Sequence, residues 1–321
     1  MFANFTYILV MAVFLEVFLQ HFWIRKMHSM KIEQVTKMYG PSWHDKAKVG
    51  TPSIGGIVFI LVMLIITAIF AYRYNFPMDR IAKIIAYPLA AAAIGFADDW
   101  LKHIRNSSEG LRSLQKLALQ VIVTVPWAIW TVKGPTPMLP GIMMSRTAGI
   151  LLASFFGVGF LNAVNVTDGL DGLAAGCTFI SFLALLFLVR MDPIVFVMSS
   201  AVCGICIGFL WHNANPAAVF MGDVGSHFLA GLLFSICVNS MVVILIIPLG
   251  FIFGIEIISV AIQIFSIRVL HKKVFRMSPI HHHFELLGWK ENQIVVRFCI
   301  IHLIGICATT TLIFMISTKI H

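Results

Sequence analysis

The sequence contains little charge. Of its 321 residues only 12% are Asp, Glu, Lys or Arg, whereas 59% are hydrophobic and the mean hydropathy is +0.92. Soluble domains usually carry about a quarter charged residues, so this scarcity excludes an ordinary soluble fold and indicates lipid as the surrounding solvent. A soluble basic domain that could bind nucleic acid is also missing, and we expect no nucleic-acid partner.

Signatures of several other protein classes are absent as well. The chain has no GxxxxGK loop, which disfavours a P-loop ATPase. No small-residue cleavage site follows the apolar stretch from Phe5 to Trp23, so we expect this stretch to be a membrane span and not a removed signal peptide. The six cysteines all lie in apolar segments, and the CxxC of Cys203 and Cys206 has no second ligand pair. We therefore interpret them as packed helix cysteines, without a redox or zinc role.

Long apolar runs make up most of the chain. Runs of about 18 residues or more predict membrane helices. We predict an all-α, polytopic integral membrane protein that forms a single domain over 1–321, with about ten transmembrane helices. Between the eighth and ninth spans, Pro248-Leu249-Gly250 is the one strong helix breaker. The predicted spans are 4–23, 54–72, 81–97, 114–132, 147–164, 173–189, 193–211, 227–247, 249–270 and 294–317.

Lysine and arginine predict the orientation of these spans. The loops after odd-numbered spans, with their flanks, hold 16 of the 23 Lys and Arg residues. Because cytoplasmic loops carry the excess of these residues, we expect those loops in the cytoplasm and both termini outside. The net charge of +9 then lies largely on the inner face, where it can meet anionic lipid or a phosphorylated substrate.

Five polar clusters fall on this predicted cytoplasmic face. The first follows the third span and contains the adjacent acids Asp98 and Asp99, with Lys102 nearby. Two neighbouring carboxylates at a membrane boundary repel each other unless a cation or basic group compensates. A solvated helix end would explain them, and so would a metal or general-base site.

The second cluster lies between the fifth and sixth spans, from Asn165 to Gly172. Asp168 and Asp171 share a face if this segment begins the next helix. The helix dipole alone favours acids in a first turn, but an asparagine, two acids and two glycines exceed what a cap requires. The glycines permit close backbone approach to a ligand.

The third cluster, between the seventh and eighth spans, runs from Asn213 to Asp223. Asp223 could simply cap the following helix, with Ser226 as a competing cap. A lone acid is a weak signal. Its weight comes from being the third acidic cluster on the same face.

The remaining clusters are basic or titratable. The run His281–His283 follows the ninth span; it is internal, unlike a purification tag. Adjacent histidines point in different directions, so few could share a zinc ion, and a phosphate-facing imidazole fits better beside so many carboxylates. Lys48 and Lys116 are explained by the positive-inside rule alone, although Lys116 at the bilayer edge would readily pair with a phosphate.

The five clusters together predict a site for a hard cation and a phosphorylated substrate. Carboxylate oxygens and basic groups suit magnesium. Phosphoryl transfer needs charge neutralisation and positioning more than covalent chemistry from the protein. We therefore expect the active site on the cytoplasmic face.

The motifs also resemble a known family. Gly50–Gly56, Phe96–Asp99, Asn162–Gly172, Phe220–Gly225 and Met277–Glu285 with Gly288-Trp289 resemble the phospho-N-acetylmuramoyl-pentapeptide-transferases of the polyprenyl-phosphate N-acetylhexosamine-1-phosphate transferase superfamily. They run in the family's order from about residue 46 to residue 297. The histidine run followed by Phe284-Glu285 looks like the muramoyl-pentapeptide branch in particular.

This resemblance implies a reaction, a place and partners. Undecaprenyl phosphate would attack the β-phosphorus of UDP-N-acetylmuramoyl-pentapeptide, giving lipid I and UMP, with Mg²⁺ required. The enzyme would be a multi-pass protein of the bacterial cytoplasmic membrane acting in peptidoglycan synthesis. Family members are typically homodimers, and nucleoside natural products are expected inhibitors. Whether an aspartate forms a covalent phosphoenzyme or acts only as a base stays open.

The resemblance also implies roles for individual residues. Asp223 would bind magnesium, and Asp98 would deprotonate or orient the lipid phosphate. The reaction centre would further include Asp99, Lys116, Asn165, Asp168 and His281. Substrate-binding positions would be Lys48, Ser53, Asn165, Gly169, Leu170, Asp171, Asn213, Phe220, His282 and His283, with Lys48, Asp171 and Asn213 holding the uridine and Phe220 stacking on uracil.

Two positions depart from the family's pattern. Ser53-Ile54 stands where the family usually has Thr-Met, a change that keeps the hydroxyl, and His227 stands where an apolar residue is usual. Two other functions remain to be separated from this one. A sister enzyme would use UDP-N-acetylglucosamine. A secondary transporter would place ionisable groups near the bilayer midplane, where this chain has only Glu16 and Glu256.

Overall fold

The computed structural model describes residues 2–30, 50–105, 107–139, 142–189, 192–240 and 243–320. Its elements are α1 Phe2–Ser29, α3 Gly56–Tyr74, α4 Met78–Arg105, α5 Ser113–Thr131, β1 Thr136–Leu139, β2 Ile142–Met144, α6 Arg146–Thr167, α7 Leu173–Leu188, α8 Pro193–Asn213, α9 Gly222–Asn239, the 3₁₀ turn η1 Val243–Leu245, α10 Ile246–Leu249, α11 Phe251–Phe265, its π-helical continuation η2 Ser266–Leu270, α12 Ile280–Glu285 and α13 Glu291–Ile320.

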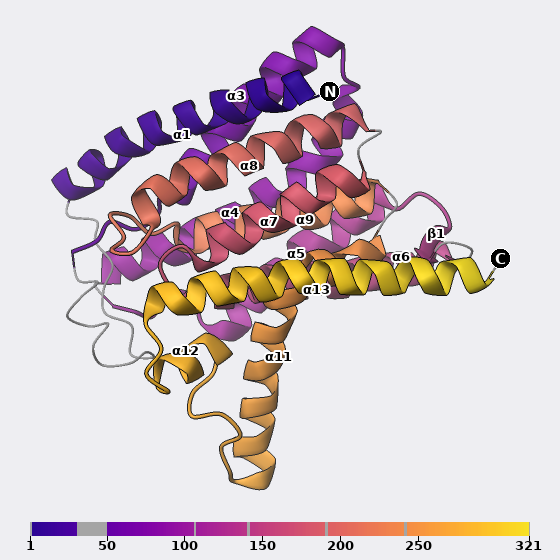
Figure 1. Cartoon of the computed structure of the whole chain (residues 1–321). Helices are drawn as coiled ribbons and strands as arrows, with labels where there is room; N and C mark the ends of the chain where they lie inside the picture. Colours follow the sequence, from indigo (N-terminus) through magenta and orange to yellow (C-terminus); the bar gives the residue numbers. More distant parts are fainter. Residues whose placement is uncertain are drawn as a thin grey trace.

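Most of the helices run side by side in one bundle, with both chain ends at the same end of it (Figure 1). Within the described ranges, seven helices are long and apolar enough to cross a membrane, namely α1, α3, α4, α6, α8, α13 and α11 with its continuation; α7 is a shorter apolar helix. The predicted all-α polytopic architecture is therefore confirmed. The number of crossings, the side on which the termini lie and the single-domain assignment stay predictions.

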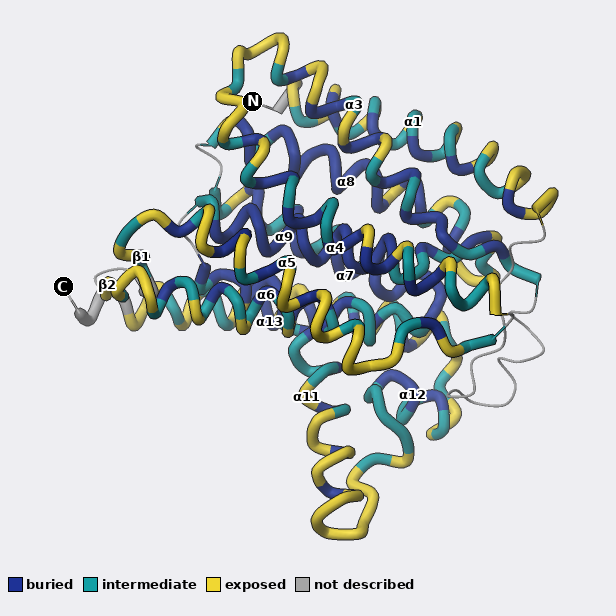
Figure 2. The backbone as a smooth tube through the Cα atoms, turned by 180° about the vertical axis from the view of Figure 1, so that it is seen from behind, coloured by how far each residue is buried: buried dark blue, intermediate teal, exposed yellow. Residues whose placement is uncertain are grey.

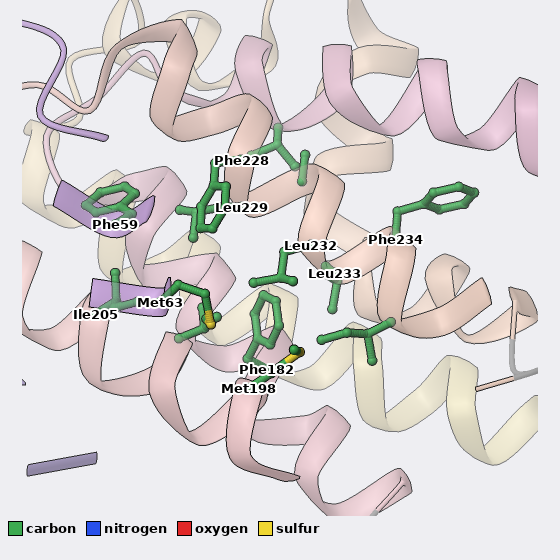
Figure 3. Packing of buried hydrophobic residues seen from close by; sticks show 14 of the residues in the cluster. Phe59, Met63, Phe182, Met198, Ile205, Phe228, Leu229, Leu232, Leu233 and Phe234 are labelled. Atoms are coloured by element: carbon green, nitrogen blue, oxygen red, sulfur yellow. The ribbon is translucent and has the colours of Figure 1, made fainter. Parts of the chain in front are cut away.

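Helix α9 forms the centre of the bundle. Every residue from Val224 to Val238 is buried, and a helix that is hydrophobic on all sides belongs in a core. Phe228, Leu232 and Phe234 lie among side chains from neighbouring helices in Figure 3. In contrast, α1 and α13 bury only a small share of their apolar residues, so they line the outside of the bundle (Figure 2).

The end of the eighth predicted span is the main correction to the sequence analysis. Helix α9 stops at Asn239, and the predicted last residues of that span instead form η1 and α10. The break predicted at Pro248–Gly250 is present, since α10 ends at Leu249 and α11 begins at Phe251. Helix α11 then runs crosswise to the bundle and projects away from it in both views (Figures 1 and 2).

Buried side chains satisfy the backbone at this break. His302 Nδ1 accepts a hydrogen bond from Ile252 N–H (3.2 Å), and its Nε2 lies 2.9 Å from Ser181 Oγ. Ser181 Oγ also donates to the carbonyl oxygen of Leu249 (2.7 Å). Irregular backbone inside a bilayer is tolerated only where protein groups satisfy it. These two side chains therefore make the change of helix direction possible.

A two-stranded antiparallel hairpin joins α5 to α6. Thr136 pairs with Met144 and Pro137 with Met143. The hairpin lies between the predicted spans 114–132 and 147–164, and strands of three or four residues are too short to give a detectable periodic pattern in the sequence.

Candidate active site

Three carboxylates from two helices meet at the junction of α4 and α9. Asp98 and Asp99 lie near the end of α4, Asp223 lies in the first turn of α9, and one oxygen of each falls within 4.8 Å of the others. Gly95 allows this approach, because a Cβ there would lie 2.3 Å from the carbonyl oxygen of Asp223. Of the residues that the structure describes, these form the only group of three or more His, Cys, Asp or Glu side chains arranged to hold a metal ion.

Lys102 lies among these carboxylates. Its Nζ is 2.6 Å from Asp98 Oδ2, 3.2 Å from Asp223 Oδ2 and 3.6 Å from Asp99 Oδ1. Buried like charges repel unless a cation compensates, and this ammonium group supplies the compensation. Lys102 belongs to the same sequence motif as the two acids, but no role was predicted for it. Its position three and four residues after the two acids was the available signal.

Two further side chains contact the Asp223 carboxylate. Lys116 Nζ lies 2.5 Å from Asp223 Oδ2, and Asn165 Nδ2 donates to Asp223 Oδ1 (2.9 Å) and to Ser226 Oγ (3.0 Å). Burial raises the pKa of this carboxyl, but Lys116 and Lys102 outweigh burial and hold the pKa well below its usual range. Asp223 precedes the predicted span 227–247, and its two lysine neighbours favour the ionised form of its carboxyl.

The two acids of α4 also position backbone. Asp99 Oδ2 accepts from Val224 N–H (3.1 Å) at the start of α9, where backbone N–H groups have no helical partner. Asp98 Oδ1 accepts from Leu111 N–H (2.8 Å) in the loop before α5. The solvated helix end considered from the sequence is ruled out, because Asp98 is 3% exposed and Asp99 is 7% exposed. Neither Asp223 nor Ser226 caps α9 with its own side chain, so the cap interpretation is wrong.

A second polar layer lies one helical turn along α5, α6 and α9 from Lys116, Asn165 and Asp223. In it, Gln120 Oε1 accepts from Asn162 Nδ2 (2.8 Å), and Gln120 Nε2 lies 3.0 Å from His227 Nε2. His227 is fully buried. The residue that departs from the family's pattern thus belongs to a hydrogen-bonded layer beside the acidic site.

The loop that contains Ser53 is bound to the segment before α9. Gly55 N–H donates to the carbonyl oxygen of Phe220 (2.9 Å), and Phe220 N–H donates to that of Pro52 (2.8 Å). Ser53 and the Phe220 ring are both half-buried. Glu16 and Gln20 of α1 are fully buried. With the oxygen and nitrogen of its side-chain amide exchanged, Gln20 donates to the carbonyl oxygen of Gly55 (3.3 Å) and to Glu16 Oε1 (3.1 Å).

The connection between α6 and α7 differs from the helix start considered from the sequence. Asp168 caps the end of α6, and α7 begins only at Leu173, after Gly172 with φ +83°. Asp168 and Asp171 therefore do not share a helical face. Gly169 is half-buried and Leu170 is buried in the same turn.

Asp171 and Asn213, two predicted uridine ligands, form hydrogen bonds to neighbouring loops. Asp171 Oδ2 accepts from Asn215 Nδ2 (3.0 Å) and Ala217 N–H (3.1 Å). Asn213 Oδ1 accepts from Gly172 N–H (2.9 Å), and its Nδ2 donates to Val219 O (2.7 Å). Sequence reasoning missed Glu291, whose Oε1 accepts from Asp171 N–H (2.7 Å). No local pattern could reveal that contact, because 120 residues separate the two.

The three histidines of α12 have three different partners. His281 Nδ1 lies 3.1 Å from Glu256 Oε1, and His282 Nδ1 lies 2.6 Å from Glu285 Oε2. His283 Nδ1 accepts from Arg276 N–H (3.1 Å). The expectation that adjacent histidines point in different directions is confirmed. Lys48, the remaining predicted site residue, lies outside the described residues.

Comparison with known proteins identifies the family of this chain. The family model for glycosyl transferase family 4 matches residues 81–241. A phospho-N-acetylmuramoyl-pentapeptide-transferase of Caldicellulosiruptor bescii is 39% identical, over 84% of this chain and 85% of that protein. Proteins with the same name from Caldanaerobacter subterraneus subsp. tengcongensis (38%) and Bacillus subtilis (36%) match over 89% and 90% of this chain and 91% and 92% of their own. The chain therefore belongs to the phospho-N-acetylmuramoyl-pentapeptide-transferase family, within glycosyl transferase family 4.

Proposed function

We propose that this chain transfers phospho-N-acetylmuramoyl-pentapeptide from UDP-N-acetylmuramoyl-pentapeptide to undecaprenyl phosphate. An oxygen of the lipid phosphate forms a bond to the β-phosphorus, the bond from that phosphorus to the bridging oxygen breaks, and UMP leaves with the electron pair. The products are lipid I and UMP. The observation that carries the proposal is the buried Asp98, Asp99 and Asp223 cluster with two lysines inside it, in a chain of this family.

The donor set fits a magnesium ion. All three acids offer hard oxygen ligands, which Mg²⁺ prefers, and the Lys102 ammonium shows that the cluster accommodates a cation. Asp223 would hold the metal, with the acids of α4 beside it. When bound, the ion would neutralise charge on the phosphates during transfer.

The other proposed roles belong to individual side chains of the site. Asp98 would orient or deprotonate the lipid phosphate, and Asp99, Asp168 and His281 would complete the reaction centre. Lys116 and Asn165, which already contact Asp223, would bind phosphate oxygens. Lys48, Ser53, Gly169, Leu170, Asp171, Asn213, Phe220, His282 and His283 are proposed to bind the rest of the substrate.

The proposed setting is the bacterial cytoplasmic membrane. We place the acidic site on its cytoplasmic face and both termini outside, with ten spans in a single domain. The length of helix α4 bears on the depth of the acids and not on the side of the membrane: its 28 residues extend for about 42 Å at 1.5 Å per residue, which exceeds a hydrocarbon core of about 30 Å. Its last turns, which carry Asp98 and Asp99, would then reach the phosphate level. A homodimer and sensitivity to nucleoside natural products are proposed from the family alone.

An assay of UMP release tests this function. Purified protein with Mg²⁺ and undecaprenyl phosphate should release UMP from UDP-N-acetylmuramoyl-pentapeptide but not from UDP-N-acetylglucosamine, and a chelator should stop the release. The reverse substrate preference would assign the chain to the sister enzyme. Substrate flux into proteoliposomes without UMP release would favour the transporter. The structure gives that alternative little support, because Glu256, one of its two predicted midplane acids, contacts His281 of the proposed site.

A further inference from the structure

A buried carboxylate from the projecting helix holds the first histidine of α12. Glu256 lies in the second turn of α11, and its Oε1 is 3.1 Å from His281 Nδ1. Both side chains are fully buried. Ionisable groups so far from water are costly unless they pair. The contact is therefore the main polar interaction of both side chains, although Glu256 precedes His281 by 25 residues and lies in a different helix.

The other ring nitrogen of His281 faces the turn after α6. A Cβ added at Gly169 would lie only 2.3 Å from His281 Nε2, so the imidazole edge is pressed against the backbone next to Asp168. His281 Nε2 has no hydrogen-bond partner among the described residues. One nitrogen thus contacts Glu256, and the other is directed to the turn between α6 and α7, which contains four predicted site residues.

This arrangement controls which nitrogen carries hydrogen. A carboxylate can only accept, so its contact with Nδ1 favours the tautomer with hydrogen on Nδ1 and a lone pair on Nε2. Carboxylates that contact the remote nitrogen of a functional histidine fix its tautomer and ring orientation in many sites. The neighbouring pair, His282 with Glu285, lies within α12 itself and leaves His281 dependent on α11.

We propose that Glu256 is a positioning residue for catalysis. It fixes the tautomer and the ring orientation of His281, so that Nε2 can accept a proton from, or return a proton to, the transferring phosphate. The proposal rests on the proposed function. It also gives α11 a role: the break at Gly250 turns the helix so that Glu256 reaches α12.

The decisive variant is Glu256→Gln, which keeps the size and one hydrogen bond but removes the carboxylate. We expect kcat for UMP release to fall about 10- to 100-fold, as for other residues that orient a functional side chain, with KM for the nucleotide sugar near the wild-type value. The matched control is Ser259→Ala, one turn further along α11, where the buried hydroxyl donates to the backbone carbonyl oxygen of Glu256 and not to its side chain. It should retain wild-type kcat.

A second measurement is independent of activity. Nitrogen-15 NMR of histidine-labelled protein, with the His281 signals assigned by their loss in His281→Gln, should show hydrogen on Nδ1 in the wild type and a redistribution toward Nε2 in Glu256→Gln. Wild-type kcat in Glu256→Gln would reduce Glu256 to a packing role and overturn the proposal, and so would hydrogen on Nε2 alone in the wild type. If the wild type releases no UMP, the proposed function fails, while the NMR experiment still decides whether Glu256 sets the tautomer.

Discussion

At the scale of single residues, Asp223 connects α9 to three other helices of the candidate site. Its carboxylate contacts Lys102 of α4, Lys116 of α5 and Asn165 of α6. The sequence alone ranked it as a lone acid with a plausible capping role. Its role as a metal ligand is a prediction from the family resemblance. The structure shows that its carboxylate contacts two lysine side chains and one side-chain amide.

Replacing Asp223 by alanine should lower kcat by about 10²-fold or more, because electrostatic groups at a reacting phosphate have effects of this size. Turnover in the UMP-release assay and its dependence on Mg²⁺ concentration measure the change. Asp79→Ala is a suitable control, since Asp79 lies in the first turn of α4, at the other end of the helix from Asp98, and pairs with Lys83 on that helix. Near-normal turnover in Asp223→Ala would contradict the metal assignment.

Lys102 illustrates what residue-level reasoning missed. Its sequence position suggested only a positive charge near the cytoplasm. The structure places its ammonium within 3.6 Å of three carboxylates, and Asp223 is 121 residues away from it. Charge compensation of this kind depends on two helices meeting, which no local pattern encodes.

At the scale of elements, the break between α10 and α11 needs its two buried partners. His302→Leu would leave Ile252 N–H without its acceptor and Ser181 without its ring contact. An unsatisfied buried donor costs about 1–3 kcal/mol, so we expect a lower thermal unfolding midpoint in detergent. Because Glu256 lies one turn after Ile252, activity should fall as well.

Thr311→Val is the control for this variant, because Thr311 is exposed on the same helix and its hydroxyl donates to the carbonyl oxygen of Cys307 one turn before it. It should unfold at the wild-type temperature. Equal midpoints for His302→Leu and the wild type would mean that the break is stable without the histidine. Ser181→Ala, which removes the bond to Leu249 O, tests the same network from α7.

At the scale of the whole molecule, the proposed orientation can be tested with two exposed lysines. Lys133 lies in the connection after α5 and Lys273 in the connection after α11. In a background with the exposed Cys307 and half-buried Cys299 changed to serine, Lys133→Cys should react with a membrane-impermeant maleimide on intact cells, and Lys273→Cys only after permeabilisation. The opposite pattern of labelling would invert the topology and place the acidic site outside.

The sequence alone determined that lipid surrounds the chain, that its fold is all-α, and approximately where its helices begin and end. Those properties depend on composition and on local runs such as 193–211, where apolar side chains continue for the thickness of a bilayer. It also located the acids, the histidines and the break at Pro248–Gly250, because short-range patterns mark them. The motifs were sufficient to recognise the family.

Only the tertiary structure decided how these pieces act together. Asp98 meets Asp223, Glu256 meets His281, and Glu291 meets Asp171 through contacts between helices distant in the sequence. The crosswise direction of α11 likewise depends on His302 and Ser181, which come from two other helices. A run of apolar residues specifies that a segment enters the membrane, but its direction and neighbours depend on packing and on satisfying buried polar groups.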